Sequence, residues 1–133
     1  MSRGSLCVEM LASPRKEVAP GTILSLTLLL ENASSSAVSG IALAVPVPVG
    51  ASYSEGSLFC DAVRRRETAF FADGFELPDL APGARTAFMW KLRVEDGEEP
   101  IRIVPQIWAG QTRVVGAEPL EIARCAEILL VDL

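Results

Sequence analysis

Apolar and polar residues alternate with a period of two along several stretches of this chain. In residues 23–32 alternate positions are leucine, and the positions between them include Ser25 and Thr27. Residues 85–94 alternate in the same way, with Trp90 on the apolar face. A period of two is typical of a strand with one buried face. Both segments are therefore predicted to be strands, with Trp90 packed in the core.

Weaker versions of the pattern predict further strands. Residues 41–47 alternate, and Pro46 and Pro48 on the opposite face should confine that end to a sheet edge, because proline cannot donate to a ladder. Pro105 suggests another edge or a bulge. The remaining expected strands are residues 6–12, 101–109 and 111–117, the last two joined near Gly110 as a hairpin.

Turn residues separate these segments. Ala19-Pro20-Gly21 and Ala81-Pro82-Gly83 each precede one of the two clearest strands. Proline presets φ and glycine accepts a positive φ, as a type II turn requires. Asp73-Gly74 stands between the apolar runs 68–71 and 75–77, which predicts a β-hairpin.

About seven short strands, with no convincing helix before residue 117, predict an all-β fold, an antiparallel immunoglobulin-like β-sandwich. We expect the sandwich to span residues 1–118, followed by a C-terminal extension over residues 119–133. The extension fits a helix, with Leu120, Ala123, Ile128 and Val131 on one face, or an apolar strand around Ile128. A terminal strand can pair with its own sheet or with a neighbour's.

Composition narrows the function classes. The chain has 133 residues, half of them apolar and 22% charged, which fits one compact domain. A net charge of -5 gives no general attraction to nucleic acid or anionic lipid, so neither is an expected partner. No apolar run approaches the ~18 residues of a membrane helix, so no membrane insertion is expected. The short apolar stretch after Arg3 is broken by Glu9 and does not fit a signal peptide.

Two segments resemble a known family. Residues 19–32, APGTILSLTLLLEN, and residues 77–94, LPDLAPGARTAFMWKLRV, resemble the two halves of the bacterial and archaeal surface repeat called domain of unknown function eleven. The resemblance covers residues 6–118. It implies a seven-stranded sandwich that occurs in tandem in cell-wall or envelope proteins as a spacer or adhesive stalk. It implies no catalytic residues and no cofactor.

Candidate chemistry is sparse. The chain contains no histidine, so imidazole is unavailable as a base or metal ligand. Cys7, Cys60 and Cys125 are widely separated and do not fit a zinc site. We expect thiols, with a bridge between two of them or a link to another chain as the alternatives. A cysteine nucleophile would lack an activating base, so no enzymatic activity, cofactor or small-molecule substrate is expected.

Three features are candidates for protein contacts. The dense basic run Arg64, Arg65 and Arg66 fits an acidic partner or phosphate, or a solvated loop or edge. Trp108 is the best candidate for an exposed aromatic contact, because its expected face also carries Gln106. The third candidate is the apolar end segment, which consists of Ile128, Leu129, Leu130 and Val131.

Two polar motifs have a functional and a structural interpretation. Residues 95–99, with four acidic side chains, could supply oxygen ligands to calcium or form a solvated hairpin. Asn32-Ala33-Ser34 matches the glycan acceptor pattern, but local turn chemistry of the amide is the favoured role.

These observations predict a non-catalytic structural or adhesive interaction module of the microbial cell envelope. One alternative is a self-assembling filament subunit in which a terminal strand completes the sheet of the next copy. Another is an intracellular accessory domain that docks on a partner protein. The location is expected to be the envelope or the extracellular space if the chain is part of a larger exported protein, and otherwise the cytoplasm.

Overall fold

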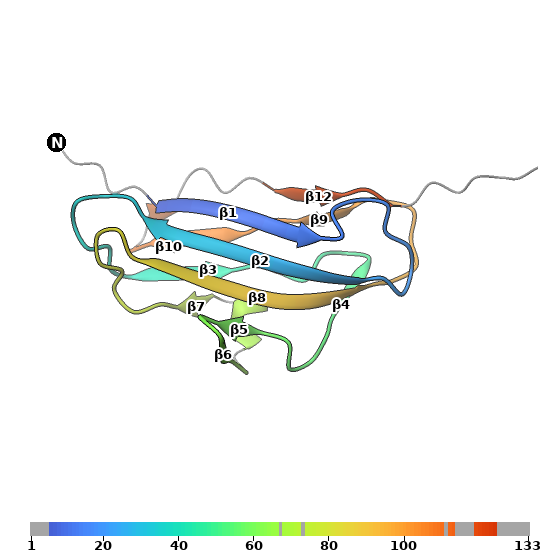
Figure 1. Ribbon diagram of the computed structural model, residues 1–133, viewed down its shortest axis with the longest axis horizontal. Helices are drawn as coiled ribbons and strands as arrows, with labels where there is room; N and C mark the ends of the chain where they lie inside the picture. The colour runs from blue at the N-terminus through green and yellow to red at the C-terminus, as the bar shows by residue number, and fades with distance from the viewer. Residues whose placement is uncertain (1–5, 67, 73, 111, 114–118, 125–133) are drawn as a thin grey trace, which may run out of the picture.

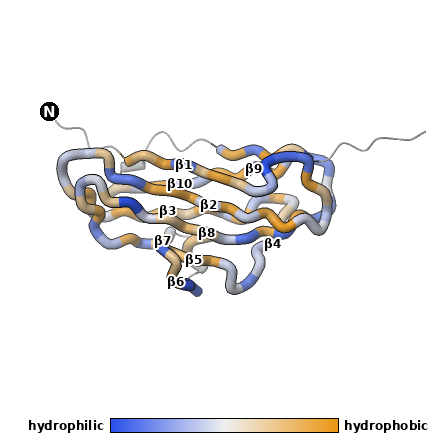
Figure 2. The backbone as a smooth tube through the Cα atoms, viewed as in Figure 1, coloured by the Kyte–Doolittle hydropathy of each residue, from blue (hydrophilic) through white to orange (hydrophobic). Residues whose placement is uncertain are grey.

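The computed structural model describes residues 6–66, 68–72, 74–110, 112–113 and 119–124. Nearly all of its regular elements are antiparallel strands, arranged in two layers (Figure 1). Hydrophobic residues concentrate on the strands and hydrophilic ones at the connections, as Figure 2 shows. The predicted all-β antiparallel sandwich is therefore confirmed as a fold class.

The larger sheet forms one layer. Its main path follows the order β1 (Leu6–Ser13), β2 (Ile23–Asn32), β8 (Arg85–Val94), β5 (Phe59–Cys60) and β6 (Val63–Arg64). The short strand β4 (Ala51–Tyr53) pairs with the last residues of β8. The two strands with the clearest alternation, β2 and β8, thus lie side by side in the middle of the sheet.

Two smaller ladders form the other layer. One has the order β11 (Thr112–Arg113), β10 (Gln106–Ala109), β3 (Ile41–Ala44) and β7 (Phe75–Glu76). The other pairs β12 (Leu120–Ile122) with β9 (Ile101–Ile103). The expected strand 101–109 is therefore divided at Pro105, and its two halves pair with different partners.

The core lies between the layers and is built on the register of β2 and β8. Leu24 stands opposite Leu92, Leu26 opposite Trp90 and Leu28 opposite Phe88. All six side chains are buried, which confirms the alternation of both strands and the core position of Trp90. Their partners from the second layer include Ile41, Leu43, Ile101, Ile103, Ile107 and Ile122.

Both Ala-Pro-Gly turns are confirmed. Thr22 N donates to Ala19 O at 3.0 Å, and Ala84 N donates to Ala81 O at 2.9 Å. The glycines at the third turn position, Gly21 and Gly83, have φ of 91° and 76°. A positive φ at this position defines a type II turn and favours glycine.

The hairpin predicted at Asp73-Gly74 is wrong. Residues 68–71 form a short 3-10 helix, η1 (Thr68–Phe71), and β7 pairs with β3 instead. Phe70 of this helix inserts between the layers, with its ring 5.3 Å from the Phe88 ring and 4.9 Å from the Trp90 ring. Burial of this aromatic ring outweighs the local preference for a two-residue turn. Asp73 itself lies outside the described residues.

The sheet edge predicted at Pro46 and Pro48 is also wrong. The strand ends at Ala44, before both prolines, and β3 pairs with β10 on one side and β7 on the other. The hairpin near Gly110 is confirmed by the pairing of β10 with β11.

The C-terminal extension begins as a strand. Leu120 and Ile122 of β12 belong to the buried core. The segment Ile128, Leu129, Leu130 and Val131 lies outside the described residues, as does Cys125.

Replacing Trp90 by alanine should lower the free energy of unfolding by about 3 to 5 kcal/mol, because the truncation leaves a cavity beside Phe70. Urea denaturation followed by circular dichroism measures this loss. Met89→Ala is the control, since Met89 is exposed on the opposite face of the same strand. A loss below about 1 kcal/mol for Trp90→Ala would contradict the register of β8.

Candidate functional site

The outward side of the larger sheet carries apolar residues where a sandwich usually presents polar ones. One row of directly opposed residues crosses four strands and consists of Leu11, Thr27, Met89 and Phe59. Leu11, Met89 and Phe59 remain 46%, 51% and 37% exposed. Exposed apolar side chains are normal when scattered singly, whereas large contiguous apolar patches are typical of contact surfaces.

The neighbouring row extends this surface. Glu9, Leu29 and Ala87 are opposed there on β1, β2 and β8, and Leu29 is half-buried. We call the surface formed by Leu11, Thr27, Leu29, Phe59 and Met89 the apolar face.

Charged residues border the apolar face at both ends. Toward one end, Arg85 Nε lies 3.4 Å from Glu31 Oε1, an exposed ion pair between opposed positions. Toward the other end, Lys91 follows Met89 at the next outward position of β8. A shallow hollow of about 700 Å³ adjoins the first end, and one of about 450 Å³ adjoins the second. The surface therefore has an apolar centre and a polar rim.

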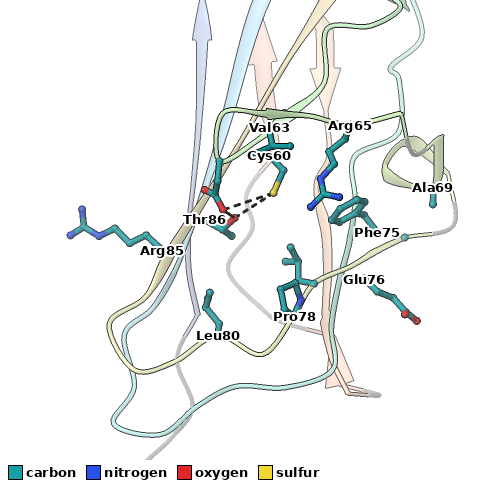
Figure 3. A pocket seen from close by; sticks show the side chains of 13 residues that line it. Cys60, Val63, Arg65, Ala69, Phe75, Glu76, Pro78, Leu80, Arg85 and Thr86 are labelled. Atoms are coloured by element: carbon teal, nitrogen blue, oxygen red, sulfur yellow. Dashed lines mark hydrogen bonds between the residues drawn. The ribbon is translucent and has the colours of Figure 1, made fainter.

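A further depression lies between the layers, at the side where β5 and β6 approach β7. It has a volume of about 620 Å³, and apolar side chains such as Val63, Phe75 and Leu80 line much of it (Figure 3). The Arg65 guanidinium carbon lies 5.8 Å from the centre of the Phe75 ring, a cation–π contact that joins the two layers.

Cys60 borders this depression within a small hydrogen-bonded group. Its Sγ lies 3.7 Å from Thr86 Oγ1, and Thr86 Oγ1 donates to Asp61 Oδ2 at 2.8 Å (Figure 3). Asp61 Oδ1 accepts from Ala87 N at 2.8 Å. Both carboxylate oxygens of Asp61 thus attach the β5–β6 turn to β8. This geometry gives the carboxylate a structural role.

The structure brings the three predicted arginines together at the edge of the larger sheet. Arg64, Arg65 and Arg66 are exposed and line a depression of about 430 Å³ with Tyr53, Glu55 and Gly56. A side chain at Gly56 would collide with the Arg64 guanidinium. The site can attract an anionic group, although Glu55 offsets part of its charge.

Trp108 lies on a different surface. It is half-buried on β10, opposite Arg113 of β11 and Ala42 of β3. Its neighbour Ile107 points into the core. Trp108 therefore belongs to the outward side of the smaller sheet and is not part of the apolar face.

The acidic residues 95–99 do not form the predicted hairpin, because they connect β8 to β9, which belongs to another sheet. An arginine holds this loop. Arg124 donates from Nε to Glu99 O at 2.6 Å and from Nη1 to Glu95 O at 2.8 Å. The Glu95 carboxylate accepts from Ser52 Oγ at 2.6 Å. Backbone carbonyls that could bind calcium are thus already bonded to a guanidinium. No group of three or more Asp, Glu or Cys suited to a metal occurs among the described residues.

The glycan motif is buried. Asn32 is 0% exposed, and its Nδ2 donates to Leu80 O at 2.8 Å and to Ser36 O at 2.9 Å. Its Oδ1 accepts from Ser34 N at 3.0 Å and from Ser34 Oγ at 2.6 Å. The predicted turn chemistry is confirmed, and the amide nitrogen is not available to a glycan.

Sequence reasoning missed the apolar face, because the row crosses four strands and depends on their register. Its trace in the sequence is that Leu11, Leu29 and Met89 stand at positions where the alternation predicts polar residues.

Comparison of the chain with protein-family models and with curated proteins finds no match. The part of the chain that the structure describes contains no helix long and apolar enough to cross a membrane.

Asn32→Ala should lower the free energy of unfolding by about 2 to 3 kcal/mol, because the carbonyls of Leu80 and Ser36 would lose their hydrogen bonds to the amide. Ser34→Ala, which removes only one side-chain bond to Asn32, should cost about 1 kcal/mol or less. Thermal or urea unfolding of both variants checks the ranking, and equal losses would assign no special role to the amide.

Ala62→Gly should raise the free energy of unfolding by about 0.5 to 1 kcal/mol. Asp61 and Ala62 form the two-residue turn between β5 and β6, with φ of 49° and 67°. Alanine is strained in this left-handed region, whereas glycine is not. Ala37→Gly, at an exposed site, serves as control and should not stabilise the protein. Unfolding midpoints in urea measure both effects, and a destabilised Ala62→Gly protein would contradict the turn geometry.

Proposed function

We propose that this chain is a non-catalytic adhesive or structural module of a microbial envelope protein, and that it binds a folded protein domain through the apolar face. The observation that carries the proposal is the exposed row of Leu11, Met89 and Phe59 across the larger sheet. A flat sheet surface with an apolar centre fits a partner surface that is also flat and apolar at its centre.

The strand order supports an immunoglobulin-like relationship. The orders β1-β2-β8-β5 and β3-β10-β11 correspond to strands A-B-E-D and C-F-G of an immunoglobulin constant-type domain. The resemblance of residues 19–32 and 77–94 to a bacterial and archaeal surface repeat supports an envelope location. Domains of both kinds serve widely as adhesive or spacer modules.

The surroundings of Cys60 support a non-catalytic role. The nearest described carboxylate, Asp61, already accepts hydrogen bonds from Thr86 Oγ1 and Ala87 N. With no histidine in the sequence, no imidazole of this chain can activate the thiol.

A second candidate is an intracellular accessory domain that uses the same face. The observation that favours it is the exposed thiol of Cys7, since cysteines persist as thiols in reducing compartments. The two candidates differ in where the partner protein is found.

Replacing Met89 by lysine should weaken partner binding by tenfold or more, because a charge would enter a desolvated contact. A tenfold loss of affinity corresponds to about 1.4 kcal/mol. Val49→Lys is the matched control, because Val49 is 93% exposed in a loop away from the apolar face. Envelope and cytosolic fractions of the source organism are passed over wild-type and both variant proteins. Proteins that bind to the wild type and to Val49→Lys but not to Met89→Lys are then purified for calorimetric titration.

A partner with this selectivity from the envelope fraction supports the envelope module. A partner with the same selectivity from the cytosol supports the intracellular accessory domain. Equal affinity of the purified partner for wild type and Met89→Lys would contradict the assignment of the apolar face. Circular dichroism of each variant verifies that the fold is retained.

A further inference from the structure

Strand β1 forms one edge of the larger sheet. Among the described residues it pairs only with β2, along its whole length. Natural edges are usually short or carry charged residues and proline, which prevent another strand from pairing. The opposite edge of this sheet fits that description, since β6 has two residues, one of them Arg64. In contrast, β1 has eight residues with Glu9 as its single charge, so it can accept a further strand.

The backbone groups that β1 does not direct to β2 belong to every second residue. Asn32 N donates to Ala84 O and Asn32 O accepts from Gly83 N, so the backbone groups of Asn32 point to the β8 side of β2. Successive residues of a strand point to opposite sides, so those of Glu31 point toward its partner Cys7 in β1. Cys7 and every second residue after it therefore bond to β2. The residues that direct N–H and C=O to the open side are Leu6, Val8, Met10 and Ala12.

The core beneath this edge is incompletely covered. The same four residues of β1 face the core, and their apolar side chains are only partly buried. The core-facing leucines of the adjacent β2 are 0% to 1% exposed. A strand beside β1 would bond to the open backbone groups and would also remove apolar surface from water, which is favourable in proportion to its area.

A second copy of β1 matches this edge in direction and in length. Two copies related by a two-fold axis perpendicular to the sheet run antiparallel, as do all the strand pairs of the described residues. The axis also keeps the core-facing residues of both copies on one side of the joined sheet. Such a contact uses the same surface of both copies, so it closes as a dimer.

Charge and strand length together select the register. With Met10 on the axis, residues 7–13 of the two copies pair. Val8 then lies opposite Ala12 of the second copy on the core side, and Glu9 lies opposite Leu11 of the second copy on the outward side. An axis at Glu9 would place two carboxylates face to face, which is destabilising. An axis at Val8 or Leu11 would pair fewer residues of the strand.

We propose that β1 pairs with β1 of a second copy, antiparallel around Met10, so that the larger sheets of two copies join into one. Met10 opposite Met10 and Val8 opposite Ala12 are the pairs that exchange both N–H···O bonds. The contact goes beyond the proposed function, because it depends on backbone groups and core-facing side chains. Of the apolar face, only Leu11 lies on β1.

Leu11 provides the test, since it would face Glu9 of the second copy. Leu11→Glu creates two like-charge pairs in each dimer, and Leu11→Lys creates two opposite-charge pairs. Leu11→Lys should therefore dimerise about tenfold more tightly than Leu11→Glu. The difference should shrink in about 1 M salt, which screens exposed charges. Sedimentation equilibrium of the full chain under reducing conditions measures both constants from the rise in mass from the 14.2 kDa monomer to twice that value.

Two controls separate the contact from the effect of net charge. Val49→Glu and Val49→Lys introduce the same charges at a loop residue that is 93% exposed. Their dimer constants should differ by about twofold or less, because salt screens a charge that is distant from the contact. Glu9→Lys combined with Leu11→Glu restores opposite charges across the contact and should dimerise about as tightly as Leu11→Lys. Circular dichroism verifies that each variant is folded.

A wild-type chain that stays monomeric at every concentration would overturn the proposal. Equal dimer constants of Leu11→Glu and Leu11→Lys would also overturn it, because both remove the leucine and only the β1 contact distinguishes their charges. Dissociation by Met89→Lys without such a difference would assign self-association to the apolar face. Particles that grow beyond a dimer would contradict a closed two-fold contact.

Discussion

The register between β2 and β8 is the constraint on which the rest of the structure depends. Nine opposed pairs, from Ile23↔Arg93 to Glu31↔Arg85, align four leucines of β2 with the apolar side of β8. A slip of one residue would place these leucines opposite the outward positions of β8, such as Lys91. Either the leucines would then face solvent or Lys91 would face the core. The same register also determines the other side of the sheet, where it places Met89 beside Thr27 and aligns Arg85 with Glu31. The core and the apolar face are thus two consequences of one pairing.

Hydrogen bonds at one end of this strand pair attach the loops to it. Asn32 N donates to Ala84 O, Gly83 N donates to Asn32 O, and the Asn32 side chain bonds the carbonyls of Leu80 and Ser36. On the same end of β8, Thr86 and Ala87 N hold the Asp61 carboxylate. No buried side-chain nitrogen or oxygen of the described residues lacks a partner. Because the polar groups are satisfied, this end of the sandwich can be closed without the cost of unpaired buried donors.

The long strands and their turns could be predicted from the sequence, because alternation over ten residues and Ala-Pro-Gly are local patterns. Phe70 and Pro105 illustrate what could not be predicted. The position of Phe70 depends on ring contacts with Phe88 and Trp90, which are distant from it in sequence. Strands β9 and β10, on either side of Pro105, differ in the strands with which they pair, β12 and β3. The sequence around Pro105 does not indicate this difference. The candidate site was less predictable still, because Leu11, Met89 and Phe59 become neighbours only through pairing. The arginine run could be located from sequence, but its contact with Phe75 could not.

The apolar face and the open edge meet at Leu11. Leu11 ends the exposed row that crosses the sheet, and it also belongs to β1, the strand that has no partner on its outer side among the described residues. A strand added at β1 would place its own outward residues next to Leu11, as cross-strand neighbours about 5 Å away. A strand added there with apolar outward residues would therefore lengthen the apolar row.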